Sequence, residues 1–307
     1  MYFSRLFFTL IFAISATFST LANAEVYKMV VAFSAGSQSD TIARMIQRSI
    51  EKNTNDKLVI VNLPGADQAI GANKFINDHT YDIMMSSSSM DVFVPIMKPN
   101  IGYKFADFEH AIYAGTQASV WVTSATSKIK TTNDMLEHMP EFIGTYAMVY
   151  ETNVMAVKKK FNANITIVSY KSGNDVLRDI VGGQLEMGIM AVSPSIIAWA
   201  KEGKVRIIGS TYHKDVTVDG VHIPSSAKTM NLPGFSGFSG FDLRPSDTLE
   251  RKEKLKKILW TALKDPETAE GIKKLLILPD SSNDKEWIYQ YINDYRKRVG
   301  AFINPVK

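Results

Sequence analysis

The sequence has no cysteine, and its five histidines lack any spacing typical of a metal site. Without thiols, the 307-residue chain forms no disulfides and has neither a thiol nucleophile nor a cysteine-ligated metal. The histidines are scattered, and no pair follows a pattern such as His-Glu-x-x-His. The sequence therefore predicts no metal site and no cofactor.

Motifs of catalysis are also missing. There is no G-x-S-x-G nucleophile elbow, so we interpret the serine run 86–89 as a hydroxyl-lined loop. The small-residue turn 34–40 has neither the G-K-[ST] of a phosphate loop nor the G-x-G-x-x-G of a dinucleotide site. The sequence therefore does not predict an enzyme. A secreted enzyme stays an alternative that would require a base and nucleophile pair.

The sequence has little excess charge and only one long apolar run. With 35 Lys and Arg against 31 Asp and Glu, the formal charge of +4 is too small and too evenly mixed for a nucleic-acid binder. The apolar run 6–18 follows Arg5 and precedes Ala22-Asn23-Ala24. This pattern predicts a signal peptide over 1–24, cleaved after Ala24, with an uncleaved anchor as the alternative. No later stretch approaches the roughly 20 apolar residues of a membrane span, so we expect a periplasmic protein.

Three predicted strands of the first half each end in a loop of small polar residues. The apolar stretch 27–33 runs into the turn 34–40 and a helix over about 40–51. The stretch 58–62 ends in a Pro-Gly turn, and 81–85 ends in the four serines. In an open parallel sheet these loops share one edge, where ligands bind. Backbone amides and hydroxyls there suit a small anion that is bound and released unchanged.

The second half has its own alternation of strands and helices between residues 142 and 210, which predicts a second domain. Residues 150–153 form a polar stretch after an apolar one. We expect 224–240, rich in Gly, Ser and Pro, to be an irregular connection. The last third is helical, and its aromatic stripe from Trp287 to Phe302 is typical of core packing.

Several motifs resemble those of one family. Residues 33–44 follow the pattern F-x-A-G-G-x-x-D-x-x-A-R, and 62–71 follow N-x-P-G-A-G-G-x-x-G. Residues 168–173 are similar to V-P-Y-K-G, and 182–186 to G-G-Q-x-D. The Pro, Gly and Phe of 232–235 also agree. In these motifs the chain resembles the tripartite tricarboxylate transporter receptors, periplasmic solute-binding proteins also called Bug receptors.

The resemblance implies an α/β type II periplasmic binding protein fold, with two open-sheet domains and a ligand cleft between them. Domain I would comprise residues 25–122 and 229–307, because the C-terminal helices return to it, and domain II residues 123–228. The implied function is capture of a small carboxylate and its delivery to a membrane transporter, with a large permease and a small four-span protein as partners. We expect a monomer. The alternative use of this fold is a ligand-presenting sensor for a membrane kinase.

The resemblance also assigns a site. Amides of the first two loops would cradle a ligand carboxylate, and second-domain residues would close over the other end. The ligand-binding residues implied in this way are Ser34, Ala35, Gly36, Ser37, Gln38, Asp40, Pro64, Gly65, Ala66, Asp67, Gln68, Ser87, Ser88, Tyr146, Met148, Tyr150, Glu151, Lys171, Ser172, Gly173, Ala191 and Ser193.

This chain departs from the family pattern at the site itself. Ser37 stands in place of a second glycine, and Asp67-Gln68 in place of paired glycines. An acid beside an anion cradle repels the expected ligand. Either Asp67 faces solvent or the ligand carries a cationic or hydroxyl-rich part, which Glu151 would also meet. Asp40 either holds such a group or caps the helix.

Overall fold

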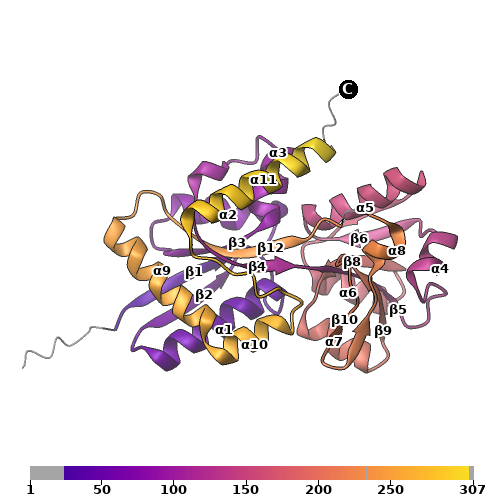
Figure 1. The fold of residues 1–307 in the computed structure, drawn as a ribbon, viewed down its shortest axis with the longest axis horizontal. Coiled ribbons are helices and arrows are strands. Elements are labelled where there is room, and N and C mark those ends of the chain that lie inside the picture. Colours follow the sequence, from indigo (N-terminus) through magenta and orange to yellow (C-terminus); the bar gives the residue numbers. More distant parts are fainter. Residues whose placement is uncertain (1–23, 233, 304–307) are drawn as a thin grey trace, which may run out of the picture.

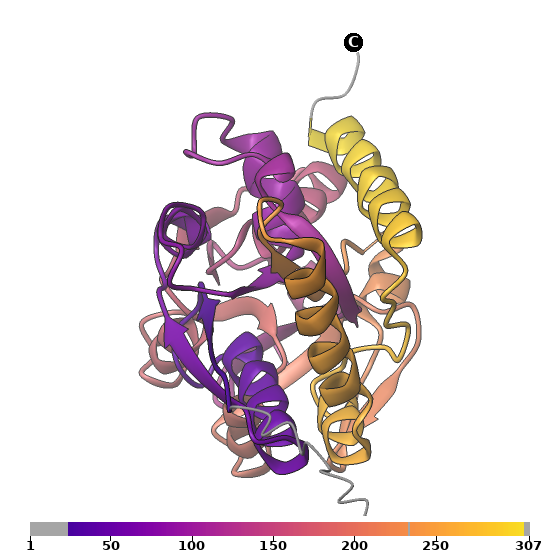
Figure 2. The same cartoon turned by 90° about the vertical axis from the view of Figure 1, so that its left-hand side faces the viewer.

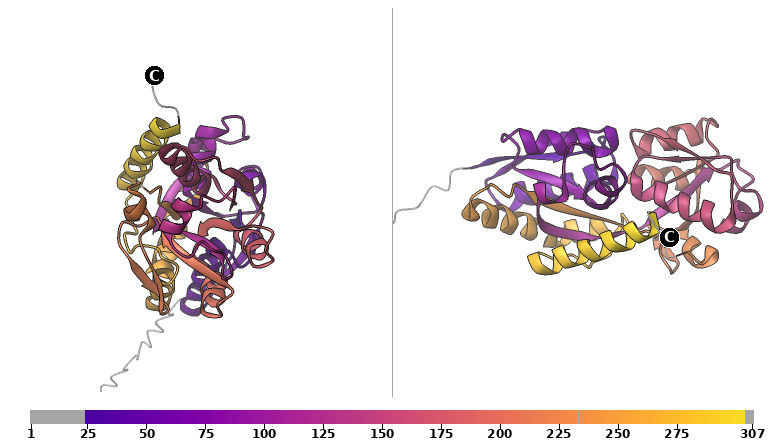
Figure 3. Two further views of the ribbon diagram at one scale, coloured as in Figure 1. Left: turned by 90° about the vertical axis from the view of Figure 1, so that its right-hand side faces the viewer. Right: turned by 90° about the horizontal axis from the view of Figure 1, so that it is seen from above.

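The computed structural model describes residues 24–232 and 234–303, arranged as two lobes side by side (Figures 1 and 3). The predicted signal peptide, apart from Ala24, lies outside the described residues. Each lobe is built on a five-stranded sheet covered by helices. No helix in the described ranges is long and apolar enough to cross a membrane.

The first lobe has a mixed sheet in the order β2-β1-β3-β12-β4. Its strands are β1 (Val26–Val31), β2 (Lys57–Asn62), β3 (Ile83–Ser87), β4 (Glu109–Gln117) and β12 (Gly237–Leu243). Its helices are α1 (Gln38–Asn53), α2 (Ala69–Asn77), α3 (Val94–Met97), α9 (Leu249–Lys264), α10 (Pro266–Lys273) and α11 (Lys285–Ile303), with helical turns η1 (Ala66–Gln68), η2 (Ser89–Phe93) and η3 (Phe105–Asp107). The strands β2, β1 and β3 are parallel, as predicted, whereas β12 runs antiparallel to β3 and β4.

The second lobe repeats this plan in the order β7-β6-β8-β5-β9. Its strands are β5 (Ser119–Ser124), β6 (Phe142–Thr145), β7 (Thr166–Ser169), β8 (Met187–Ala191) and β9 (Val205–Ser210), with the hairpin β10 (Val216–Val218) and β11 (Val221–Ile223). Its helices are α4 (Thr132–Glu137), α5 (Met148–Phe161), α6 (Gly173–Val181), α7 (Pro194–Lys201) and α8 (Ser226–Met230). The strand β5 is antiparallel to both of its neighbours.

The chain crosses between the lobes from β4 to β5 and returns ahead of β12 (Figure 1). Near the first crossing, Ala118 donates its amide to the carbonyl of Leu276, which follows α10. The Tyr212 hydroxyl of the second lobe donates to the same carbonyl at 2.8 Å. The predicted division after residue 122 falls inside β5, a strand of the second sheet.

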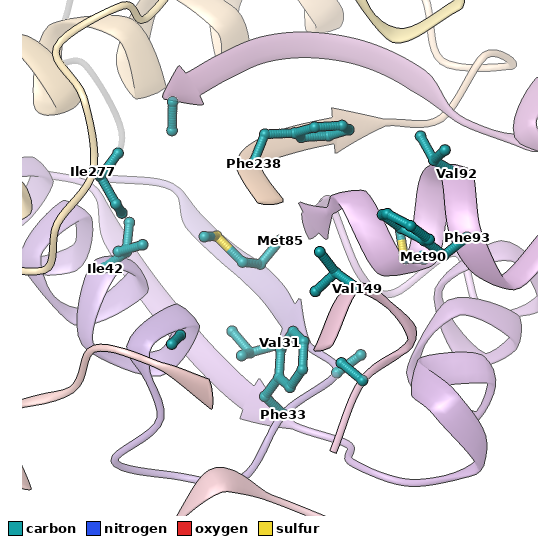
Figure 4. Packing of buried hydrophobic residues seen from close by; sticks show 14 of the residues in the cluster. Val31, Phe33, Ile42, Met85, Met90, Val92, Phe93, Val149, Phe238 and Ile277 are labelled. Carbon is teal, nitrogen blue, oxygen red and sulfur yellow. The ribbon is translucent and has the colours of Figure 1, made fainter. Parts of the chain in front are cut away.

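The C-terminal helices cover the first lobe, as Figure 2 shows. The aromatic stripe of α11 packs on the sheet: the Tyr291 and Trp287 rings lie 4.9 and 5.3 Å from that of Tyr113. The main apolar cluster joins the lobes, since Val149 of α5 belongs to it together with Val31 and Met85 (Figure 4).

Three elements differ from the sequence prediction. The polar stretch 150–153 lies inside α5, because its side chains are satisfied locally rather than by solvent. Asn153, for example, donates to the carbonyls of Val149 and Phe235. Residues 237–240, placed in an irregular connection, belong to the strand β12, which lies between β3 and β4. The serine run closes β3 and begins η2 rather than forming a loop.

Candidate functional site

A cavity of about 210 Å³ lies between the lobes. The first lobe lines it with residues that follow β1 and β2, and the second lobe with residues at and after the ends of β6 and β7. The lining residues are Ala32, Phe33, Gly65, Ala66, Asp67, Gln68, Tyr146, Ser169, Tyr170 and Lys171. All four strands are in parallel pairings, so the cavity lies where carboxyl ends of parallel strands converge, the usual ligand position in such sheets. Another hollow of about 390 Å³, between α1 and α9, lies on the outer helices and lacks this arrangement.

The turn after β2 has an unusual backbone. Ala66, Asp67 and Gln68 all have left-handed conformations, with φ values of 47°, 52° and 74°. Such a conformation costs a non-glycine residue roughly 1–2 kcal/mol. Two side-chain contacts offset part of this cost: Asp67 forms an ion pair with Lys98, and Gln68 accepts a hydrogen bond from Ser87.

Most polar side chains of the turn after β1 form hydrogen bonds within the first lobe. Ser37 caps α1 by accepting from the amide of Asp40 at 3.2 Å. Asp40 itself accepts from the Gly36 amide at 2.8 Å and from Arg44 at 2.9 Å. Burial opposes its charged form, but these hydrogen bonds outweigh the burial and lower the pKa of Asp40. The N-cap of α1 is therefore Ser37, while Asp40 stands in the first turn and its carboxylate is engaged by Gly36 and Arg44.

A second polar side chain of this segment is also engaged within the first lobe. Gln38 donates to the carbonyl of Leu275 at 2.8 Å. The turn does border the second lobe, because the carbonyl of Ala35 lies 3.4 Å from the side-chain amide of Asn174. None of the residues 34–38 is among those lining the cavity.

Aromatic rings form the second-lobe wall. The Tyr146 ring meets Phe33 edge-on at 6.1 Å, across the boundary between the lobes. Its hydroxyl lies 3.1 Å from that of Tyr150 and accepts from the amide of Ala191 at 3.3 Å. A Cβ at Gly173 would stand 2.9 Å from the Tyr146 ring, so glycine is needed there for the ring to pack.

The charged groups of this wall differ in their surroundings. The Glu151 carboxylate is buried and accepts from the hydroxyls of Ser169 at 2.9 Å and Thr145 at 3.4 Å. Lys171 lines the cavity but is exposed, and the described residues offer it no ion-pair partner. The wall therefore presents one available cation, while its acid is bound by hydroxyl groups.

The lobes are in contact around the cavity. Besides the pairs Phe33–Tyr146 and Ala35–Asn174, the amide of Val149 donates to the hydroxyl of Ser89 at 3.2 Å. Of these pairs, Phe33 and Tyr146 line the cavity, so separation of the lobes would open it.

The structure brings some of the implied site residues together and separates others. Gly65, Ala66, Asp67, Gln68, Tyr146 and Lys171 line the cavity. Ser172 and Ser193 cap α6 and α7, Met148 is buried in the core, and Ser88 is buried with its hydroxyl unpaired among the described residues. Four lining residues were not predicted, namely Ala32, Phe33, Ser169 and Tyr170. Each directly precedes or lies inside a quoted motif, which is the signal that could have found them.

A separate buried cluster joins Asp91, His110 and Asp242, whose potential ligand atoms lie within 4.8 Å of one another. The His110 Nδ1 lies 2.9 Å from Asp242 and 3.9 Å from Asp91. These groups are of the kind that hold a divalent cation, but the cluster is not among the residues that line the cavity. Sequence spacing does not reveal it, because its members come from three different elements.

Comparisons with known proteins agree with this architecture. A family model described as tripartite tricarboxylate transporter family receptor matches residues 42–307. A Pseudomonas sp. (strain P51) protein, named for the tcbD-tcbE intergenic region, is 26% identical over 263 residues, 80% of this chain and 76% of that protein.

Two solved structures share the fold. A Rhodopseudomonas palustris protein with adipate aligns with a TM-score of 0.82 at 18% identity, covering 92% of this chain and 97% of its own. MatC of the same species, with bound malate, aligns with a TM-score of 0.78 at 17% identity, covering 92% and 100%. The fold is therefore that of periplasmic binding proteins, as predicted. Because the family model covers nearly all of the predicted mature chain, this protein belongs to the tripartite tricarboxylate transporter receptor family.

Proposed function

We propose that this protein is a periplasmic receptor that captures a small organic acid between its two lobes and delivers it to a membrane transporter. In this proposal residues 1–24 are a signal peptide cleaved after Ala24, the mature chain acts as a monomer, and it does not turn its ligand over. The partners would be a large permease and a small four-span protein.

The cavity between the lobes carries this proposal. It combines a strained turn, one available cation and three aromatic rings in a volume of about 210 Å³, which fits a small molecule. The domains of the proposal are residues 25–122 with 229–307, and residues 123–228. Separation of the lobes would release the ligand, and closure around it would signal occupancy to the transporter.

Anion-binding groups at both ends of the cavity would orient the ligand. Amides of the turn after β2, which lines the cavity, would bind one carboxylate, as oriented backbone donors do. The exposed Lys171 would pair with a second carboxylate at the other end. The rings of Phe33, Tyr146 and Tyr170 would contact the carbon chain between them. A dicarboxylate of malate or adipate size meets all three requirements, and structural relatives hold those two acids.

Thermal unfolding of the mature chain with added acids tests the proposal. Mono-, di- and tricarboxylates, among them malate, succinate and adipate, are added to separate samples, with butanol as a neutral control. A ligand present at 100 times its Kd stabilises the folded state by about 2.7 kcal/mol, which raises the Tm measurably. Melting curves unchanged by every mono-, di- and tricarboxylate would contradict the proposal, as would consumption of the bound acid.

Replacement of the available cation sharpens the test. Lys171→Met should weaken the binding of dicarboxylates more than that of monocarboxylates of the same length, because only a dicarboxylate has a second carboxylate that reaches the cation. Lys201→Met, at the exposed end of α7, is the matched control. If Lys171→Met weakens the binding of both acid classes equally, Lys171 does not contact the second carboxylate.

A further inference from the structure

The side chain of Gln68 stands out in the turn after β2. Its left-handed backbone, with φ of 74°, is one that glycine adopts without strain. The side chain is nevertheless present, is 3% exposed, and belongs to the cavity lining. A strained residue in a binding cleft suggests that its side chain is retained for function.

A relay of hydrogen bonds orients the Gln68 carboxamide. The amide of Met90 donates to the hydroxyl of Ser87 at 3.3 Å, and this hydroxyl donates to Oε1 of Gln68 at 2.6 Å. The oxygen end of the carboxamide is therefore engaged. The other end, Nε2, is buried and has no acceptor among the described residues. A buried donor without an acceptor costs free energy, which a bound ligand offering an oxygen would recover.

We propose that Gln68 is a specificity-determining residue whose side-chain amide donates to an oxygen of the bound acid, so that this end of the cleft selects carboxylates without an adjacent ammonium group. The inference rests on the proposed function. With its oxygen held by Ser87, Gln68 presents only N–H donors, which a carboxylate accepts and an ammonium group cannot. The neighbouring Asp67 is already paired with Lys98, so its charge is offset and does not favour an ammonium group.

Matched pairs of acids test this selectivity by isothermal titration calorimetry. The probes are succinate against aspartate and adipate against 2-aminoadipate, which differ only in the amino group. For the wild type we expect the unsubstituted acid of each pair to bind more tightly. Gln68→Met removes the donor and keeps the length, and should weaken succinate or adipate roughly 10- to 100-fold, the range for a hydrogen bond to a charged group. Gln68→Glu replaces the donor by an acceptor and should narrow or reverse the preference.

Two further variants separate the ligand contact from a structural role. Gln68→Gly relieves the left-handed strain, so we expect a ligand-free Tm equal to or above that of the wild type together with weaker binding. Gln47→Met is the matched control, because Gln47 of α1 donates to a backbone carbonyl at 2.7 Å and does not line the cavity. It should leave affinity unchanged.

The outcomes distinguish the inference from the proposed function. If the wild type binds no acid, the proposed function fails and the inference fails with it. If the wild type binds an acid but Gln68→Met and Gln68→Gly bind it equally well, only the inference is overturned. Tighter binding of aspartate than of succinate by the wild type would also overturn it.

Discussion

The buried cluster of Asp91, His110 and Asp242 predicts that the protein loses stability as the pH rises above neutrality. His110 lies on β4 and is 2% exposed. Burial alone lowers its pKa, but the carboxylates of Asp242 on β12 and Asp91 on η2 outweigh burial and raise the pKa to about 9. Burial and the charge of Asp242 raise the pKa of Asp91 well above its usual value. At neutral pH His110 is therefore charged.

The other side chains around the cluster do not reverse the upward shift of the His110 pKa. Two side chains of α11 face the cluster. Arg296 donates to the backbone carbonyl of Asp91 at 2.8 Å, and the Tyr289 ring meets His110 at 5.4 Å. The Phe105 ring of η3 stacks on His110 at 4.3 Å. None of these three side chains is a carboxylate, so none adds a negative charge that would raise the pKa of His110 further.

The direction and size of the effect follow from proton linkage. The pKa of His110 rises from its ordinary value of 6.5 in the unfolded chain to about 9 in the folded protein. Its contribution is therefore complete below pH 6.5 and is lost as the pH rises through 9. A rise of this size corresponds to about 3 kcal/mol. Asp91 also binds its proton more tightly when folded, so its titration acts in the same direction.

Urea unfolding between pH 6.5 and 9.5 measures the effect. One extra proton in the folded state gives a slope of about 1.4 kcal/mol per pH unit. The shift of His110 alone should cost the wild type about 3 kcal/mol over the window. Asp91→Asn removes one of the two carboxylates that raise the pKa of His110, so it should reduce the loss of stability. His110→Gln should lower stability at pH 6.5 and flatten the curve further.

His222→Gln is the matched control. The His222 side chain also faces an acid, Asp215 at 3.8 Å, but it is 66% exposed, so water screens the pair. It should retain the wild-type slope. The reasoning is refuted if wild type and His110→Gln lose equal stability between pH 6.5 and 9.5, because the slope would then come from other groups.

Two further predictions concern the connections between the lobes. Gly115→Ala should lower the free energy of unfolding by about 2–4 kcal/mol, since φ is +144° and the added Cβ would lie 2.4 Å from the carbonyl of Leu278. Gly203→Ala, with a positive φ but open space around it, should cost less in the same urea titration, and equal costs would remove the steric explanation. Asn153→Ala should cost about 2–4 kcal/mol in chemical unfolding, because it leaves the amide and carbonyl of Phe235 without partners; a change below 0.5 kcal/mol, roughly a surface effect, would contradict this.

Much of the fold is predictable from the sequence because apolar patterns mark the strands of both sheets. The strands 27–33, 58–62 and 81–85 were expected within a few residues of β1, β2 and β3. The start of helix α5 was not predicted, because its first turns are buried on all sides and show no apolar periodicity. The strand β12 was not predicted because it contains glycines and serines, which are typical of loops. In the structure these small residues allow close packing between β3 and β4, since a Cβ at Gly240 would lie 2.5 Å from a neighbouring carbonyl.

The candidate site is predictable where one segment builds it. The motif 62–71 identifies the turn after β2, which lines the cavity with four residues. The motif 33–44 identifies the turn after β1, but not that Gln38 and Asp40 are engaged inside the first lobe. The family pattern gives a segment's place in the fold, whereas the partner of each side chain depends on the segments packed against it.

The cluster around His110 shows why long-range sites stay hidden in the sequence. Asp242 and His110 are directly paired across β12 and β4, next to an irregularity at Phe241 and Asp242 where the register shifts. In a regular ladder a shift of one residue moves a side chain to the opposite face of the sheet. The meeting of these two side chains therefore depends on one local irregularity between strands that are 132 residues apart in the sequence. No spacing along the chain encodes that shift, so only the paired strands reveal that two acids and a histidine share one buried volume.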